Sequence, residues 1–277
     1  MKQTSCKKAK LSLALGAAAV AIPLFMLFPG QATKRQKAPF WGVNFAHRGL
    51  HARDKSIPEN SLAAFELASR AGYGMELDVQ LSKDGQVVVF HDGTLDRVCG
   101  VHARVDSLTY AELQELRLCG TEHTIPLFSE VLKTIRGRGP LIVELKNGPR
   151  NRELCEKTYA LLSDYRGDVC VESFNPLIVM WFRFHARDLV RGQLAAPIKE
   201  YKGEVSKPMA FLLSHGLTNF FCRPQFIAYR IGFRPVTVRL AEALGAMKVA
   251  WTSHEPRNQK GNDAVIFEFY KPTVKYK

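Results

Sequence analysis

Acidic residues are missing from the first 40 positions of this 277-residue chain, and their absence accounts for much of its net charge. These positions carry seven lysines and arginines, so they supply +7 of the formal net charge of +13 and leave about +6 for residues 41–277. A bias of this size is typical of a solvated cationic surface with a moderate preference for anionic partners. The chain also lacks a basic helix and an aromatic-interleaved RNA motif, so no nucleic-acid partner is expected.

Cysteines with metal-binding or redox spacing are also missing. Of the six cysteines, Cys6 lies in the leading segment, and the other five form neither a CxxC pair nor a Cys/His zinc pattern. An odd number argues against a complete disulfide framework. Cys99 and Cys119 flank one connecting segment and could pair. Cys155 and Cys170 fall in helical and strand patterns, where a free buried cysteine is the default.

Residues 11–28 contain no charged side chain and follow a lysine-rich start, which is typical of a membrane or export segment. Pro23 and small residues at 30–32 allow a cleavable signal peptide, but the run is longer than the usual cleaved apolar core of about 7 to 15 residues. We favour an uncleaved N-terminal anchor at residues 1–40. Its basic flanks bias the orientation weakly toward a body outside the cytoplasm, and cleavage would give a secreted protein.

Two carboxylates share one face of a β-rich stretch at residues 75–92. Side chains alternate along a strand, so Glu76 and Asp78 point one way and their apolar neighbours the other. A solvated strand face would leave both as surface charges, whereas a buried pair of acids usually needs a cation. A tight turn at residues 83–86 then leads to a second run that ends at His91.

Other polar side chains lie at the ends of predicted strands. His47 ends a strand at residues 43–47, before a glycine turn, where a lone histidine is more often structural than catalytic. Glu144 and Lys146 project from the apolar run at residues 141–146, on the face opposite its leucines and valine. These two residues could simply pair with each other.

Strand and helix patterns alternate along the body without an internal repeat, whereas residues 94–105 are predicted to be a loop. Eight or nine short strands with interleaved helices predict a parallel α/β protein, a (β/α)8 TIM barrel in residues 41–277, preceded by the transmembrane or signal helix. The turn at Asp84 and Gly85 is too short for a crossover helix, so we expect an irregular barrel between Leu81 and Val87. The C-terminal strand ends of such a barrel meet at one mouth, which would gather His47, Glu76, Asp78, His91, Glu144 and Lys146.

Short motifs follow one another from residue 43 to residue 252. They are AHRG at 46–49, PENS at 58–61, ELDV at 76–79, DG at 84–85, VVFHD at 88–92, LDR at 95–97, IPL at 125–127, ELK at 144–146, ESFN at 172–175 and WT at 251–252. This ordered set resembles the glycerophosphodiester phosphodiesterase family, which belongs to the phospholipase-C-like barrels. The resemblance covers nearly the whole body.

The resemblance implies hydrolysis of a glycerophosphodiester to glycerol 3-phosphate and an alcohol, with one divalent cation held by Glu76, Asp78 and Glu144. Three carboxylates without a soft ligand independently favour Mg²⁺ or Ca²⁺ over zinc. The further roles that it implies are general acid and base for His47 and His91, phosphate contacts for Arg48 and Lys146, and supporting contacts for Glu59, Asn60 and Trp251.

Two segments depart from the family pattern. Members commonly end with a Trp-Thr-Val-Asn strand and a Thr-Asp strand, whereas here Ser-His follows Trp251-Thr252 and the last strand reads VIFEF at 265–269. This departure bears on the alcohol and glycerol pocket. Residues 211–234 are rich in Phe and Arg, which suits either a lipid-facing rim or a core helix with exposed arginines.

Two other functions are compatible with the sequence. An anchor with a basic flank would hold the mouth near anionic lipid, which suits a phosphodiesterase acting on phospholipid, lysophospholipid or a teichoic-type polymer. A membrane-tethered binding module on an inactive barrel is disfavoured, because both histidines and all three acids are present.

Overall fold

The computed structural model describes residue 22, residues 24–201 and residues 203–277. Most of the predicted membrane segment, namely residues 11–21 and 23, lies outside these described residues. Within them, no helix combines the length and apolar character needed to cross a bilayer.

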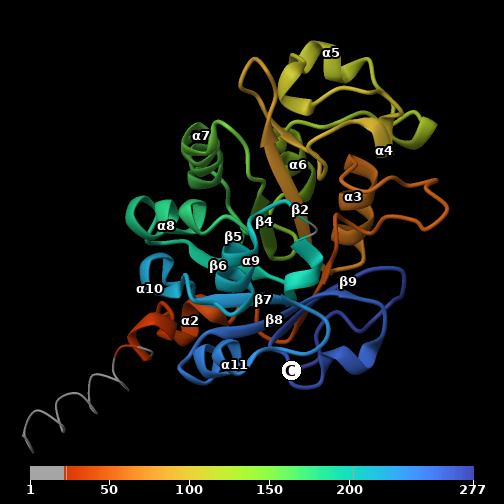
Figure 1. Ribbon diagram of the computed structural model, residues 1–277. Coiled ribbons are helices and arrows are strands. Elements are labelled where there is room, and N and C mark those ends of the chain that lie inside the picture. Colours follow the sequence, from red (N-terminus) through yellow and green to blue (C-terminus); the bar gives the residue numbers. More distant parts are fainter. Residues whose placement is uncertain (1–21, 23, 202) are drawn as a thin grey trace, which may run out of the picture.

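Eight parallel strands close into a barrel (Figure 1). They are β1 (Val43–Ala46), β2 (Gly74–Leu81), β4 (Leu141–Leu145), β5 (Val169–Ser173), β6 (Val190–Ala195), β7 (Phe226–Arg230), β8 (Met247–Ser253) and β9 (Ala264–Phe267). Their order is β1-β9-β8-β7-β6-β5-β4-β2, and the pairing of β1 with β2 closes the cycle. The predicted parallel α/β barrel is confirmed.

The barrel is irregular where the short turn predicted it. β3 (Val87–Val89) pairs antiparallel with the end of β2, with Val79 opposite Val89. β1 pairs with β2 only at Gly74 and Met75, so β3 occupies the same edge of β2 further along. Gly85 has a φ of 78° in the connecting turn, a conformation that glycine adopts without a steric penalty.

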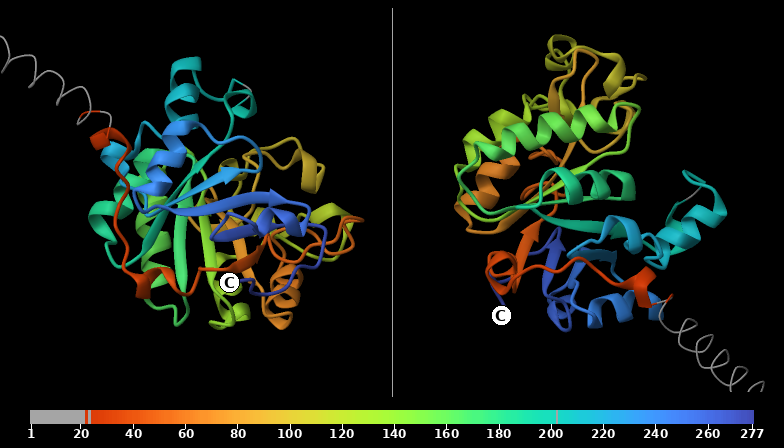
Figure 2. Two further views of the ribbon diagram at one scale, coloured as in Figure 1. Left: turned by 90° about the horizontal axis from the view of Figure 1, so that it is seen from below. Right: turned by 90° about the vertical axis from the view of Figure 1, so that its left-hand side faces the viewer.

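Helices cover the outside of the barrel (Figure 2). They are α3 (Leu62–Arg70), α6 (Phe128–Ile135), α7 (Asn151–Ser163), α8 (Pro176–His185), α10 (Asn219–Cys222) and α11 (Val236–Ala243). In contrast, α9 (Lys207–Ser214) projects beyond the strand ends, next to η3 (Ile198–Tyr201). Strand side chains alternate between two cores. Phe45, Ile142 and Phe226 fill the barrel interior, while Met75 and Val143 face the helices.

A small unit follows β3 and lies beside the barrel at the top of Figure 1. The predicted loop at residues 94–105 is partly wrong, because α4 (Asp96–Cys99) lies within it. The unit also contains η1 (Val105–Ser107), α5 (Tyr110–Gln114) and η2 (Leu118–Gly120). Its own cluster of buried residues includes Phe90, Leu95 and Leu113, which explains why a segment without a strong helical period is ordered. Cys99 and Cys119 are free thiols here.

The stretch before β1 runs past the N-terminal strand ends, with α2 (Lys34–Lys37) in it (Figure 2, left). The Gly30 amide donates to Pro224 O at 2.9 Å, and the Gly42 amide donates to Asp263 O at 2.6 Å. Lys37 Nζ donates to Gly245 O at 2.7 Å. These acceptors precede β7, β8 and β9, so residues 30–42 are packed against the barrel.

Candidate active site

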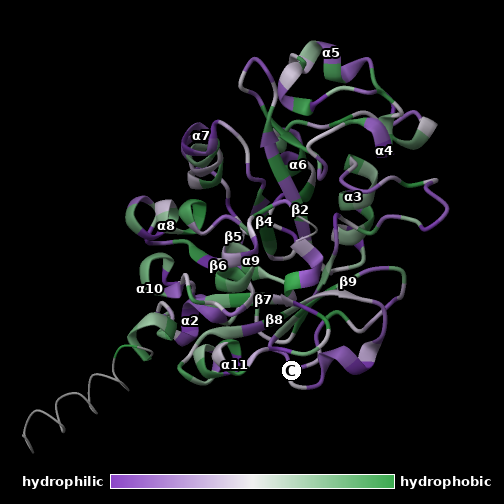
Figure 3. Cartoon of the chain, in the orientation of Figure 1, coloured by the Kyte–Doolittle hydropathy of each residue, from purple (hydrophilic) through white to green (hydrophobic). Residues whose placement is uncertain are grey.

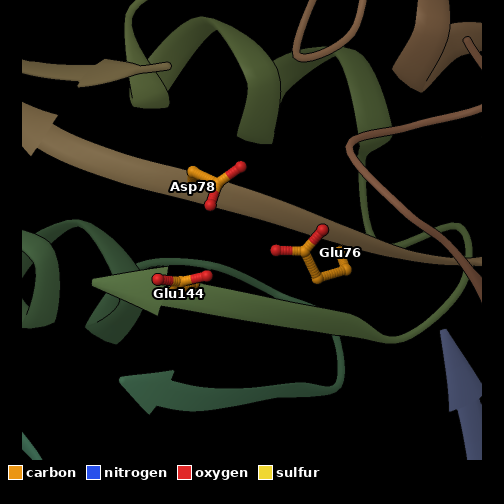
Figure 4. A group of neighbouring side chains, drawn as sticks. All are labelled: Glu76, Asp78 and Glu144. Carbon is orange, nitrogen blue, oxygen red and sulfur yellow. The ribbon is translucent and has the colours of Figure 1, made fainter. Parts of the chain in front are cut away.

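Three carboxylates converge inside the barrel (Figure 4). Glu76 and Asp78 come from β2, and Glu144 comes from β4, where it lies opposite Asp78 in the strand register. One oxygen of each residue lies within 4.8 Å of the others, and all three residues are buried. The face predicted from strand alternation is therefore correct, since the apolar neighbours point outward.

A fourth acid belongs to this cluster. Glu172 on β5 lies opposite Glu144 in the register. It is 2% exposed, and its Oε2 has no hydrogen-bond partner among the described residues. Burial and the neighbouring carboxylates raise the pKa of Glu76 and of Glu172 well above its usual range. So many buried acids call for a cation.

Lys146 supplies one positive charge to the cluster. Its Nζ lies 2.8 Å from Glu144 Oε1 and 3.4 Å from Asp78 Oδ1. The simple pairing of Glu144 with Lys146 therefore exists, but Asp78 shares the ammonium. Burial opposes the charged form of Lys146, and the two carboxylates outweigh burial and raise its pKa. Burial nevertheless raises the pKa of Glu144 to about 7.

These residues fit a divalent cation. The three clustered side chains offer only carboxylate oxygens, which are the donors that Mg²⁺ and Ca²⁺ prefer. Acid oxygens already gather around the Lys146 ammonium. The unpartnered oxygen of Glu172 is a buried acceptor for which the described residues provide no donor.

His47 follows β1 and faces the cluster. Its Nδ1 lies 3.0 Å from Glu268 Oε2, and its Nε2 lies 3.9 Å from Glu76 Oε2. Burial and the charge of Arg48 lower the pKa of His47, against the opposing effect of Glu268. The ring is therefore neutral near neutral pH.

The turn after His47 requires unusual backbone conformations. Arg48 and Gly49 have φ values of 54° and 79°. A Cβ at Gly49 would lie 2.8 Å from the carbonyl carbon of Ala64, so only glycine fits against α3. The turn aims the Arg48 amide at Glu76 Oε2, at 3.0 Å. A non-glycine residue in this region is strained, as is common at functional sites.

His91 lies two residues beyond β3 and begins a chain of hydrogen bonds and ion pairs. Its Nδ1 lies 2.6 Å from Asp92 Oδ1, and burial lowers its pKa. Arg97 joins Asp92 to Glu59 through contacts of 2.6 to 2.8 Å. Glu59 in turn accepts from Arg48 Nη1 at 2.7 Å. The network thus connects the loop after β1 with the loop after β3.

The two other predicted supporting residues differ in position. Asn60 Nδ2 donates to Asp78 Oδ2 at 2.9 Å, so Asn60 contacts the acid cluster. Trp251 lies on β8, where its Nε1 donates to Ala195 O at 3.1 Å and its ring meets Phe174 edge-on at 5.8 Å. The structure therefore places Trp251 among aromatic side chains and not with the acid cluster.

Sequence reasoning missed four side chains that contact predicted site residues or share their cluster. Asp92, which contacts His91, was noted only as part of VVFHD. Glu172 was part of the ESFN motif, and strand alternation from Cys170 would have placed it on the inner face. Glu268 was noted only as a departure in the last strand, and Arg97 only as part of LDR. The contacts of Glu268 and Arg97 depend on loops far apart in the sequence, which strand periodicity does not encode.

Comparison with known proteins identifies the family to which this chain belongs. The model of the glycerophosphoryl diester phosphodiesterase family matches residues 47–269, so the chain belongs to this family. A glycerophosphodiester phosphodiesterase of Bacillus altitudinis is 40% identical over 112 residues, which are 37% of this chain and 44% of that protein. The lysophospholipase D GDPD1 of Rattus norvegicus is 33% identical over 165 residues, 55% of this chain and 51% of that protein. The chain thus spans about half the length of these relatives.

Solved structures cover more of the chain. A phosphodiesterase of Oleispira antarctica, solved with the product sn-glycerol-3-phosphate, has a TM-score of 0.67 at 25% identity and covers 82% of this chain and 93% of its own. A glycerophosphodiester phosphodiesterase of Thermotoga maritima has a TM-score of 0.61 at 24% identity, with 81% and 93% covered. The second likeness shows the barrel fold alone.

Proposed function

We propose that this protein hydrolyses glycerophosphodiesters to glycerol 3-phosphate and an alcohol. The observation that carries the proposal is the buried cluster of Glu76, Asp78 and Glu144 near His47 and His91, in a chain of this family. A phosphodiester is anionic, so attack on it requires positive charge at the non-bridging oxygens and protons at the right places.

The two histidines are suited to proton transfer. Carboxylates contact Nδ1 of both rings, and within the described residues no hydrogen bond occupies Nε2. Burial keeps both rings neutral near neutral pH, so each can accept a proton and later release it. One histidine would accept the proton of the nucleophile, and the other would donate a proton to the leaving alkoxide. These roles are the same whether the nucleophile is water or the neighbouring glycerol hydroxyl.

Arg48 and Lys146 are proposed to bind the phosphate. Both are cations at the edge of the acid cluster, with Arg48 Nε 3.6 Å from Asp78 Oδ2. A pocket of about 90 Å³ opens beside His91 and Lys146, and Arg104 and Arg150 also line it. Asp106 also lines this pocket and pairs with Arg104. The lining nevertheless carries more cations than acids, which suits an anionic substrate.

Glu76, Asp78 and Glu144 would hold the divalent cation, Mg²⁺ or Ca²⁺. When bound, the cation would disperse negative charge on the phosphate. Asn60 supports Asp78 through its side-chain amide, and Glu59 orients Arg48.

The location of the protein is a separate proposal. The charge-free run at residues 11–28 and its basic flanks support a membrane anchor at residues 1–40, with the catalytic body outside the cytoplasm. Cleavage within that segment would instead release the body.

Lysophospholipids are a second candidate substrate, because one of the related proteins bears the name lysophospholipase D. Hydrolysis of glycerophosphoethanolamine should be compared with hydrolysis of lysophospholipid and of intact phospholipid vesicles, each with a chelated control. Turnover of the soluble diester alone supports the first proposal, and turnover of lipid alone replaces it. Absence of turnover with every substrate in the presence of metal would contradict both.

A further inference from the structure

A second basic site lies on the flank of the barrel, away from the acids. A pocket of about 520 Å³ is lined by residues that include Phe25, Phe28, Arg183, Arg191 and Arg223. We call these five residues the arginine–phenylalanine surface. Arg183 comes from α8 and Arg191 from β6, while Arg223 follows α10.

Three guanidinium groups gather here without an acid. Arg183 Nη1 donates to Phe221 O at 2.6 Å, and Arg191 Nη2 donates to Arg223 O at 2.9 Å. Arg223 Nη1 donates to Phe25 O at 2.8 Å. These acceptors are backbone carbonyls, and no carboxylate of the described residues pairs with the three arginines. Burial and the charge of Arg183 lower the pKa of Arg191 to about 10, as expected of crowded like charges. The surface therefore favours an anion.

Exposed aromatic rings lie beside these charges. Phe25 is 61% exposed and Phe184 is 52% exposed. Arg223 Cζ lies 4.5 Å from the ring centre of Phe25, and Arg183 Cζ lies 4.9 Å from that of Phe184. Residues 24–27, a short helical turn that precedes α2, are hydrophobic in Figure 3. Apolar rings with cationic groups over them match the boundary of a bilayer, where acyl chains meet phosphates.

The sequence leading to this surface identifies the occupant. The charge-free run of residues 11–28 ends within it, at Phe25 and Phe28. A free phosphate would leave the exposed rings without a role. We propose that the arginine–phenylalanine surface docks on the phosphates of anionic lipids, with its phenylalanine rings in the apolar layer.

This surface lies far from the mouth. In the closed strand order, β6 and β7 lie across the barrel from β1 and β2, which lead to or carry His47, Glu76 and Asp78. Arg191 is near the start of β6 and Arg223 precedes β7, whereas the candidate active site is at the C-terminal strand ends. A lipid docked here is not the one hydrolysed, and the mouth stays open to water and to soluble diesters.

The test uses the full-length protein in lipid nanodiscs of phosphatidylcholine, with or without phosphatidylglycerol. Hydrogen exchange is followed in peptides covering residues 24–30 and 219–224. We expect slower exchange in the anionic discs, and the Arg183→Gln/Arg223→Gln variant should lose this protection on the order of 10-fold, because each basic residue near an anionic surface strengthens binding several-fold. Arg117→Gln is the matched control, since Arg117 also donates only to backbone carbonyls but lies beside α5.

The proposal is overturned if exchange is equal in both lipids, or if the double variant keeps its protection. It is also overturned if inorganic phosphate protects the same peptides equally in detergent, because the ligand would then be a free anion. If the double variant does not fold, the wild type alone still tests the proposal, because added salt should remove its protection from exchange in the anionic discs. Hydrolysis of glycerophosphoethanolamine should be unchanged in the double variant, so failure of the proposed activity is distinguished from failure of docking.

Discussion

Glu268 contacts His47 at the end of the last strand, with 3.0 Å between Oε2 and Nδ1. His254 Nε2 lies 3.4 Å from the other oxygen, and His51 Nε2 lies 3.8 Å from Oε2. This carboxylate directly follows β9, in the segment at residues 265–269 that departs from the family pattern. The departure therefore includes the carboxylate that contacts the His47 ring, and is not confined to the expected glycerol pocket.

Replacing Glu268 should lower turnover without removing substrate binding. The carboxylate fixes the orientation of the His47 ring and stabilises its protonated form, so Glu268→Gln should lower kcat roughly 10- to 100-fold and leave KM nearly constant. Steady-state kinetics on glycerophosphoethanolamine measures both quantities. Glu255→Gln, a change of an exposed acid nearby, is the control. If KM instead rose by as much as kcat is expected to fall, with kcat unchanged, Glu268 would be assigned to the substrate pocket.

Metal binding should depend on the three clustered carboxylates. Glu76→Ala, Asp78→Ala and Glu144→Ala should each weaken Mg²⁺ or Ca²⁺ binding, because each removes one hard oxygen ligand. Chelator should abolish turnover, and added cation should restore it. Calorimetric titration of each variant measures the affinity. Full activity in chelator is incompatible with this site.

Alanine substitutions at the two histidines and at Lys146 should have different kinetic effects. His47→Ala or His91→Ala should slow turnover on the order of 10²- to 10⁴-fold, the usual loss of a general acid or base, with little change in metal affinity. Lys146→Ala should also weaken substrate binding, because a cation at the phosphate acts on the ground state as well. A histidine variant that folds but loses the metal would make that histidine a ligand or its direct support.

Acid should weaken the ion-pair network around Glu59. Burial alone would raise its pKa, but the hydrogen bonds from Arg97 and the charge of Arg48 outweigh burial and lower the pKa from 4.5 to about 2. A lowered folded-state pKa stabilises the fold above pH 4.5, and this contribution disappears as the pH falls to about 2. Wild type should exceed Glu59→Gln by about 3 kcal/mol in the free energy of unfolding at pH 7. Urea titrations should show this gap closing between pH 4.5 and 2.

A gap that stays constant with pH would show that Glu59 contributes through packing and not through its charge. Glu156→Gln replaces an exposed carboxyl on α7 that pairs with Arg152. It serves as the control, and its difference from wild type should stay small over the same range.

Truncation should distinguish two parts of the leading segment. Removing residues 1–21 keeps the contacts of Gly30, Lys37 and Gly42 with the barrel. Removing residues 1–38 deletes two of them and uncovers the start of β7, so we expect a lower Tm for the longer deletion. Thermal unfolding of both proteins tests this. Equal Tm values would show that residues 22–38 add nothing to the stability of the barrel.

The sequence alone determined the barrel and the core of the candidate site, because both follow from strand periodicity. Alternation placed Glu76, Asp78 and Glu144 on inner faces, and a turn too short for a helix predicted the hairpin of β2 and β3. It also indicated that His47 ends a strand. These are local properties of the chain, so no knowledge of distant contacts was needed.

Only the tertiary structure decided which side chains complete the site. Glu268 reaches His47 across 221 positions, and Arg97 reaches Glu59 across 38. Glu172 joins the acids because β5 lies beside β4 in a particular register. Such contacts depend on barrel closure and loop geometry. Hydrophobic periodicity specifies which face of a strand is buried, but not which distant residue it meets.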